Sequence, residues 1–231
     1  MRRFDLTGMA VLVLLSGTLL FPVRGSASPF DSPQGNHSKH HQMSHQSASL
    51  QAKAVDVNLH DLELVDKHGN PVFFVSDVVK DRLVAINFVY TTCKNVCPIQ
   101  SSIFESLQEQ LKDRSKQDVF LISITIDPLV DVPDRLQEYS AKYQAGPGWI
   151  WLTGKKENVD QVLLGLGAYS SDVFEHQNTI LVGDGLHGRW TRFYGFPNIG
   201  QLTSKFMELE VYRKNQVKQT PGVIVPGSFS H

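Results

Sequence analysis

Hydrophobic and polar positions follow two different periods from residue 54 onward, and these periods predict strands and helices in turn. Residues 55–75 alternate apolar with polar side chains around a turn at residues 68–71, which is typical of a β-hairpin. Nearly continuous apolar runs, typical of strands buried on both faces, occur at residues 82–90, 119–126 and 149–154.

Helices are predicted between these runs. Within residues 98–111 the apolar Ile103, Leu107 and Leu111 recur at every fourth position, which gives a helix one apolar stripe. Further helices are predicted at residues 133–143, 159–169 and 201–212, and a closing hairpin at residues 178–195. Because strands alternate with helices, we expect an α/β domain at residues 54–213, with a central, largely parallel sheet and helices on its faces. The tail at residues 214–231 contains Pro221 and Pro226 and is predicted to be loose.

The first 28 residues have the pattern of an export signal. Arg2 and Arg3 precede a charge-free run of 18 residues, Leu6–Val23, and small residues follow as far as Ser28. This pattern indicates a secretory signal peptide, although a run of 18 uncharged residues is also at the short limit for a membrane-spanning helix. A cleaved signal and a retained membrane anchor both remain open. In either case we expect the chain to be exported, and to be periplasmic or anchored to the membrane facing the periplasm.

Residues 29–53 are rich in Ser, Gln and His and contain almost no large apolar side chain, so we expect a flexible linker. Within it one methionine stands among four histidines: His37, His40, His41, Met43 and His45. Imidazole and thioether groups are donors that bind soft or borderline metal ions. A solvated linker with an accidental bias to His is the alternative.

The charge balance argues against one class of partner. The chain has 22 Lys and Arg against 23 Asp and Glu, a formal net charge of -1. There is therefore no overall excess of positive charge to neutralise phosphates, and we do not expect nucleic acid as a partner.

The only two cysteines, Cys93 and Cys97, lie between a predicted buried strand and a predicted helix. An oxidising compartment would allow them to form a disulfide. Pro98 suits the first position of the helix, which places Cys97 near its N-cap. The positive end of the helix dipole and the nearby Lys94 favour thiolate there. A purely structural bridge is a weak explanation, because so short a loop removes little entropy from the unfolded chain.

The spacing of the two cysteines separates three interpretations. Thioredoxin-like reductases have two residues between their cysteines, whereas this chain has three. A peroxiredoxin has a Thr three residues before its reactive Cys-Pro, and this chain has Lys94 there. Three intervening residues allow both sulfurs to turn toward one soft ion of low coordination number, such as Cu(I).

Three segments together resemble the Sco (SenC) family: residues 88–98 with the Cys-x-x-x-Cys-Pro element, residues 122–143 with an Asp-Pro-x-x-Asp-x-Pro element, and residues 175–185. The resemblance covers about residues 57–209. It implies a thioredoxin-like fold, with a central mixed sheet flanked by helices and an N-terminal β-hairpin. Members are exported, commonly membrane-tethered, and assist cytochrome c oxidase assembly. The resemblance further implies that copper, as Cu(I) or Cu(II), is held by the two cysteines and one downstream histidine, with cytochrome c oxidase subunit II as the acceptor.

The resemblance selects His176 as the third copper ligand, because the family's ligand precedes the strand that leads into an Asp-Gly turn. The chain departs from the family pattern there, with Gln177 and Asn178 before the strand and no proline in the turn. His187 lies within that turn and is expected to be exposed.

Two aspartates are weaker candidates. Asp127 ends a predicted strand beside the expected site and could orient a metal ligand, although formation of an Asp-Pro turn is the favoured explanation. Asp131 is expected to cap the helix that begins at Pro133.

Two functions follow from these residues. A copper metallochaperone would bind the metal through Cys93, Cys97 and His176. A thiol-disulfide oxidoreductase would use Cys93 and Cys97 as catalytic residues and would not need the histidine. The sequence leaves open whether the protein is an enzyme.

Overall fold

A computed structural model describes residues 52–112 and 119–219. The predicted signal peptide or anchor, nearly all of the His-rich linker and residues 220–231 lie outside the described residues, so these assignments remain predictions. Among the described helices, none combines the length and the apolar character that crossing a membrane requires.

One mixed sheet organises the described residues, and its strand order is β1-β8-β7-β4-β5-β6-β2-β3. The central strands β4, β5 and β6 run parallel, and the outer strands add to them in antiparallel pairs. The strands are β1 (Ala52–Val55), β2 (Glu63–Asp66), β3 (Pro71–Phe73), β4 (Leu83–Val89), β5 (Val119–Thr125), β6 (Trp149–Thr153), β7 (Thr179–Asp184) and β8 (Arg189–Tyr194).

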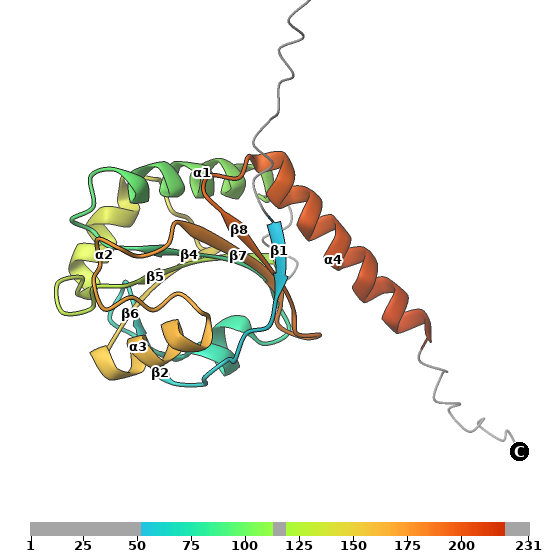
Figure 1. The fold of residues 1–231 in the computed structure, drawn as a ribbon, viewed down its shortest axis with the longest axis horizontal. Helices are drawn as coiled ribbons and strands as arrows, with labels where there is room; N and C mark the ends of the chain where they lie inside the picture. The colour runs from blue at the N-terminus through green and yellow to red at the C-terminus, as the bar shows by residue number, and fades with distance from the viewer. Residues whose placement is uncertain (1–51, 113–118, 220–231) are drawn as a thin grey trace, which may run out of the picture. The chain divides into compact units, whose positions relative to one another are not determined.

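Helices cover the sheet, as Figure 1 shows, with α1 above it and α3 below it. α4 contacts both α1 and β7, and α2 contacts β6. The helices are a short π-helix, η1 (Phe74–Val79), followed by α1 (Val96–Gln110), α2 (Pro133–Ala141), α3 (Lys156–Gly165) and α4 (Ile199–Gln219).

Aromatic side chains join α1 and α2 to the sheet. The ring centroid of Trp149 in β6 lies 5.7 Å from that of Phe104 in α1, and Trp151 lies 5.7 Å from Tyr139 in α2. The indole N–H of Trp149 donates to the hydroxyl of Ser123, at 2.9 Å. Burying each large apolar side chain stabilises the fold by roughly 1.5–3 kcal/mol, so these contacts fix the position of α1 on the sheet.

The position of the cysteines follows from strand β4, whose seven residues are all buried. Its Asn87 is paired with Ser123 of the parallel β5 and with Ile180 of the antiparallel β7. The carboxyl ends of β4 and β5 therefore lie beside the amino end of β7. The segments that follow β4 and β5 and the segment that precedes β7 meet at this end of the sheet.

The structure confirms the predicted strands and the N-terminal hairpin. The expectation of a largely parallel sheet is wrong, because only the β4–β5 and β5–β6 pairs are parallel and the other five described pairs are antiparallel. Several boundaries also differ. Strand β1 begins at Ala52, two residues before the expected start of the domain, because its backbone pairs with β8. Helix α3 begins and ends earlier than predicted. Helix α4 continues through the first part of the tail that was predicted to be loose, as far as Gln219.

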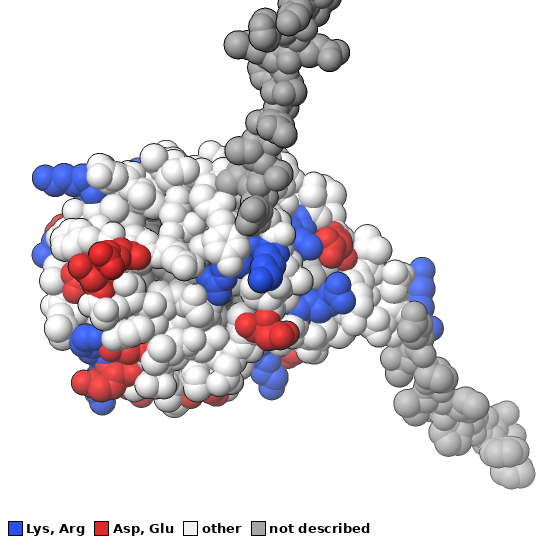
Figure 2. Space-filling view, viewed as in Figure 1, with Lys and Arg blue, Asp and Glu red and all other residues white. Residues whose placement is uncertain are grey.

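Charged side chains show no strong segregation on the face seen in Figure 2, where small groups of Lys and Arg lie among small groups of Asp and Glu. The described surface also exposes several large apolar residues, including Phe174 and Leu129, which are 79% and 73% exposed.

Candidate metal centre

The two cysteines lie on the loop and first turn that follow β4. Helix α1 begins at Val96, with Asn95 at its N-cap, so Cys97 lies near the cap as predicted, inside the first turn. Pro98 is the third residue of the helix and not the first, as was predicted. Cys97 is fully buried, and Cys93 is partly exposed. Both are free thiols in the structure. Their oxidation to a disulfide remains a prediction.

The first turn of α1 donates a backbone hydrogen bond to the Cys93 sulfur, which lowers the pKa of Cys93. The backbone N–H of Cys97 donates to the Cys93 sulfur at 3.3 Å. Burial by itself raises the pKa of Cys93, but hydrogen bonds from the backbone of Cys97 and Asn95 and from the side chains of Cys97 and Tyr90 outweigh it and lower that pKa. Cys93 is therefore the sulfur that is more readily a thiolate.

Cys97 behaves in the opposite way. Burial raises its pKa strongly, and the charges of Cys93 and Asp131 raise it further, although a backbone hydrogen bond with Tyr90 partly opposes them. The expectation that the helix end favours a thiolate therefore holds for Cys93 and is wrong for Cys97, because the helix buries Cys97 against the sheet.

His176 lies at the same end of the sheet, between α3 and β7. Its Nδ1 is 2.8 Å from the backbone oxygen of Val173. A carbonyl only accepts hydrogen bonds, so the proton is assigned to Nδ1 and the lone pair to Nε2. The Nε2 atom is buried and has no hydrogen-bond partner among the described residues. The ring is thus held in the tautomer that binds metals through Nε2.

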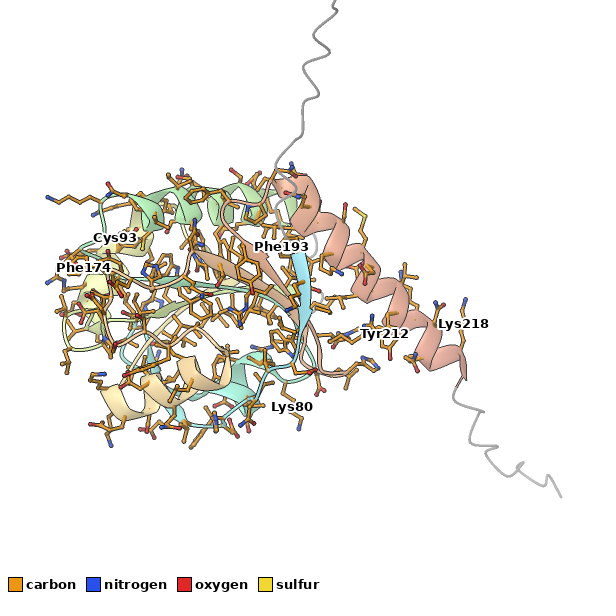
Figure 3. All side chains as sticks on the ribbon, in the orientation of Figure 1. Lys80, Cys93, Phe174, Phe193, Tyr212 and Lys218 are labelled. Atoms are coloured by element: carbon orange, nitrogen blue, oxygen red, sulfur yellow. The ribbon has the colours of Figure 1, made fainter. Side chains whose placement is uncertain are left out.

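Tyr90 connects the cysteines to His176. Its hydroxyl donates to Cys93, and its ring meets the His176 ring edge-on, with centroids 5.6 Å apart. Phe174 meets another edge of Tyr90, at 6.1 Å. Burial, together with the contact with Cys93, raises the pKa of Tyr90 to about 12, so the phenol remains a donor at neutral pH. Figure 3 shows Cys93 and Phe174 at the same end of the domain.

The structure brings the three predicted ligands to one end of the sheet without closing them around a point. Within residues 52–112 and 119–219, no three or more His, Cys, Asp or Glu side chains form a group that could hold a metal ion. Cys93 and Cys97 are in contact, and Tyr90 links Cys93 to His176.

Asp131 supports the dithiol loop, a role the sequence did not predict. It is fully buried, and its carboxylate accepts hydrogen bonds from the Thr91 N–H at 3.0 Å, the Thr91 hydroxyl at 2.5 Å and the Thr125 hydroxyl at 2.7 Å. The predicted cap is wrong, since the α2 N-cap is Val132 and no side chain caps it. The sequence contained one indication of this contact: Thr91 lies two residues before Cys93, and Asp131 follows the next strand.

Asp127 forms a turn. Its backbone oxygen accepts from the N–H groups of Val130 and Asp131, and its own N–H donates to the Thr125 hydroxyl at 3.0 Å. Burial and the neighbouring Asp131 raise the pKa of its carboxyl group. Its described hydrogen bonds support the local-turn interpretation, and Asp131 is the aspartate that reaches the dithiol loop.

His187 lies at the other end of β7 and is only partly exposed, contrary to expectation. Its Nδ1 lies 2.9 Å from a carboxylate oxygen of Asp184, which also binds Arg213 of α4. This histidine belongs to the contact between the β7–β8 turn and α4.

The mixed sheet with its covering helices, and a Cys-x-x-x-Cys pair that opens the helix after the central strand, define a thioredoxin-like protein. The SCO1/SenC family model matches residues 51–187, more than half of the chain, and the chain belongs to this family.

Named relatives and solved structures agree with this assignment. A SCO2-like protein of Rickettsia conorii is 35% identical over 102 residues, which are 44% of this chain and 47% of that protein. The chain spans about half the length of the curated relatives it matches.

Two solved structures have the same fold. Bradyrhizobium japonicum ScoI with copper bound aligns with a TM-score of 0.55 and 21% identity over 65% of this chain and 98% of that one. BsSco, a member of the Sco family of cytochrome c oxidase assembly proteins in which a disulfide switch was identified, aligns with a TM-score of 0.54 and 22% identity over 66% of this chain and 95% of that one. At these identities the likeness establishes the fold.

Proposed function

We propose that this protein is a copper metallochaperone that binds one copper ion through Cys93, Cys97 and His176 and delivers it to a respiratory oxidase. The observation that carries the proposal is the buried Nε2 of His176, which has no hydrogen-bond partner in the described part of the chain and lies at the same end of the sheet as the only two cysteines of the sequence. An unsatisfied buried acceptor costs stability, and its use as a metal ligand explains why it is there.

The donor set suits copper. Two thiolates and one imidazole are soft and borderline donors, and three of them satisfy Cu(I), while Cu(II) depends more on the nitrogen. Copper-bound structures of the fold and the family membership support the same metal.

The two sulfurs have different tasks in this proposal. Cys93 is available as a thiolate, whereas Cys97 must lose its proton when copper binds, because only deprotonated sulfur is a metal ligand. Residues 168–178 contain neither helix nor strand, and copper binding in this proposal requires this segment to bring Nε2 toward the sulfurs. Copper uptake should therefore release protons and weaken as the pH falls.

Delivery proceeds by ligand exchange. A side chain of the partner forms a bond to copper as a bond from this chain breaks, so the ion is never free. The partly exposed Cys93 is the sulfur that a partner reaches first. We propose subunit II of cytochrome c oxidase as the acceptor, on the basis of the family and of the oxidase assembly role named for BsSco. Export to the periplasm, with or without a retained anchor, would bring the site to such a partner.

The proposal is tested by metal analysis and Cu(I) competition on the reduced chain. Replacement of either cysteine by Ser should nearly abolish binding. His176→Ala should leave two-sulfur Cu(I) binding but lose most Cu(II) affinity, and His187→Ala should change neither. Cu(II) affinity that is equal in wild type and His176→Ala would contradict the proposed ligand set.

A thiol-disulfide oxidoreductase is the second candidate, and the contrast between the two cysteines favours it. The Cys93 thiolate would attack one sulfur of a partner's disulfide and release the other as a thiolate. Cys97, after losing its proton, would attack Cys93, so that the partner leaves fully reduced and this chain holds the Cys93–Cys97 disulfide. Rapid turnover of a disulfide substrate, unaffected by His176→Ala and abolished by either cysteine change, would support this function over copper delivery.

A further inference from the structure

We infer that Gln100 is a positioning residue for the copper site: its side chain ties the helix that carries Cys97 to the segment that carries His176. The inference rests on the proposed function and adds the residue that sets the third ligand in place.

Gln100 lies on α1, less than one turn after Cys97, and its side chain is almost completely buried, at 1% exposure. Its Nε2 donates to the Oδ1 of Asn178 and to the backbone oxygen of Thr179, at 3.3 Å from the latter. The Thr179 carbonyl can only accept, which fixes the orientation of the Gln100 amide. Asn178 is two residues after His176, so these bonds hold the end of the His176 segment against α1.

The segment is anchored at both ends. Its first residue, Ala168, donates its N–H to the Leu163 oxygen of α3 at 2.8 Å. At its other end the backbone oxygen of Asn178 accepts from the N–H of Gly195, after β8, at 2.8 Å. Gln100 is the side chain that adds α1 to this second anchor. It therefore relates the position of His176 to the helix that carries Cys97, and not only to the sheet.

The Gln100 side chain is a costly choice for packing alone. Its Oε1 is buried without a hydrogen-bond partner among the described residues. The other buried residues of α1 are Cys97, Ser101, Phe104 and Leu107. A buried acceptor without a partner is unfavourable, and local choices of this kind concentrate at functional sites. The two hydrogen bonds that the Gln100 Nε2 donates, to Asn178 and Thr179, explain why an amide side chain is present here.

The test compares variants of the full reduced chain loaded anaerobically with one equivalent of Cu(II). The readouts are the sulfur-to-copper charge-transfer absorption, which reports sulfur-bound copper and not copper held by histidines elsewhere, and the Cu(II) and Cu(I) affinities. Gln100→Ala and Asn178→Ala should lower Cu(II) affinity about 10- to 100-fold, as outer-shell changes typically do. Both should shift the absorption toward that of His176→Ala, with Cu(I) affinity nearly unchanged.

Two controls separate positioning from a general loss of packing. Asn178→Asp keeps an acceptor for the Gln100 amide and should retain the wild-type spectrum. Gln108→Ala removes a similar tie on the same helix, in which Gln108 accepts from the Gly146 N–H at 2.7 Å and donates to the Gln144 oxygen at 3.1 Å. It should leave the spectrum unchanged, because this tie lies at the other end of α1.

The outcomes distinguish the inference from the function on which it rests. If Gln100→Ala and Asn178→Ala both keep the wild-type absorption and Cu(II) affinity while His176→Ala changes them, the positioning role is refuted and the copper site stands. If His176→Ala itself changes nothing, the proposed ligand set fails and the inference fails with it. Unchanged Cu(I) affinity in each variant reports an intact dithiol, and Asn178→Ala remains a test if Gln100→Ala does not fold.

Discussion

Tyr90 contacts both parts of the proposed copper site with different parts of its side chain. The hydroxyl donates to Cys93, and the ring packs against His176 and Phe174. Tyr90→Phe removes only the hydroxyl. Because that hydrogen bond favours the thiolate, we predict that the pKa of Cys93 rises in this variant.

The measurement is the pH profile of Cys93 alkylation in the reduced, copper-free chain. The profile should move to higher pH in Tyr90→Phe, with Cys97 protected in both proteins by burial. An unchanged profile, or one that moves to lower pH, would show that the phenol does not support the thiolate.

The Asp131 carboxylate accepts two hydrogen bonds from Thr91 in the dithiol loop and one from Thr125 at the end of β5. Asp131→Ala leaves the N–H and hydroxyl of Thr91 and the hydroxyl of Thr125 without this acceptor. We predict a loss of roughly 3 kcal/mol in the free energy of unfolding, since each unsatisfied buried group costs about 1–3 kcal/mol. Urea denaturation measures this loss.

The control is Asp134→Ala, which removes an exposed carboxylate in the first turn of α2 and should lower the free energy of unfolding by less than about 1 kcal/mol. Equal losses in the two variants would contradict the role of Asp131.

At the scale of elements, the β7–β8 turn anchors helix α4. The buried Asp184 accepts from the Nε of Arg213 at 3.0 Å and from its terminal nitrogen at 2.6 Å. Burial raises the pKa of Asp184, but the bonds from Arg213, His187 and the Leu186 backbone outweigh it and hold that pKa below the ordinary 3.8. Figure 3 shows the neighbouring Tyr212 on α4, at the end of the domain away from Cys93.

This anchor predicts a pH-dependent contribution to stability. A carboxyl group whose pKa is lower in the folded chain stabilises fully above its unfolded pKa, near 3.8, and loses the contribution as the pH falls through the folded pKa. Arg213→Met should therefore cost about 3 kcal/mol at pH 7, because it leaves a buried carboxylate without its cation. The difference from wild type should shrink below that pH. Urea unfolding across acid pH tests this, with the exposed Lys214→Met as control. A constant difference would rule out the ion pair as its source.

The sequence predicts an element well where burial leaves a local pattern. All of β4 is buried, and its apolar run indicates it directly. Strand β1 has mostly exposed side chains and forms because its backbone pairs with β8, so no apolar pattern marks it. Helix α4 is tied to β7 by the bonds between Arg213 and Asp184, which lie far apart in the sequence, so no local pattern records this contact beside the predicted loose tail.

The same distinction applies to the site. Cys93 and Cys97 share one motif, and the selection of His176 rests on the resemblance and stays a prediction. The links from Tyr90 to His176 and from Gln100 to Asn178 join residues far apart in the chain, and no local period records them. The sequence gives one indication of the role of Gln100, which is that a polar residue lies on the buried face of α1 between Cys97 and Phe104.

At the scale of the molecule, the first strand and the last helix indicate new limits for the folded domain, from residue 52 to residue 219. We predict that a fragment of residues 52–219 folds alone, because it contains every described strand and helix. A fragment of residues 54–213 should be less stable, since it loses the pairing of Ala52 and Lys53 with β8 and the end of α4. Two lost backbone hydrogen bonds correspond to about 1–3 kcal/mol. Circular dichroism and urea unfolding of both fragments decide this, and an unfolded 52–219 fragment beside a folded full chain would refute the limits.

The central claim is that Cys93, Cys97 and His176 bind one copper ion together, and X-ray absorption of the reduced full chain with one equivalent of Cu(I) tests it most directly. We predict a shell of two sulfurs and one imidazole nitrogen in the wild type. The nitrogen should be absent in His176→Ala and present in His187→Ala. A wild-type shell without nitrogen, or a nitrogen that persists in His176→Ala, would contradict the claim.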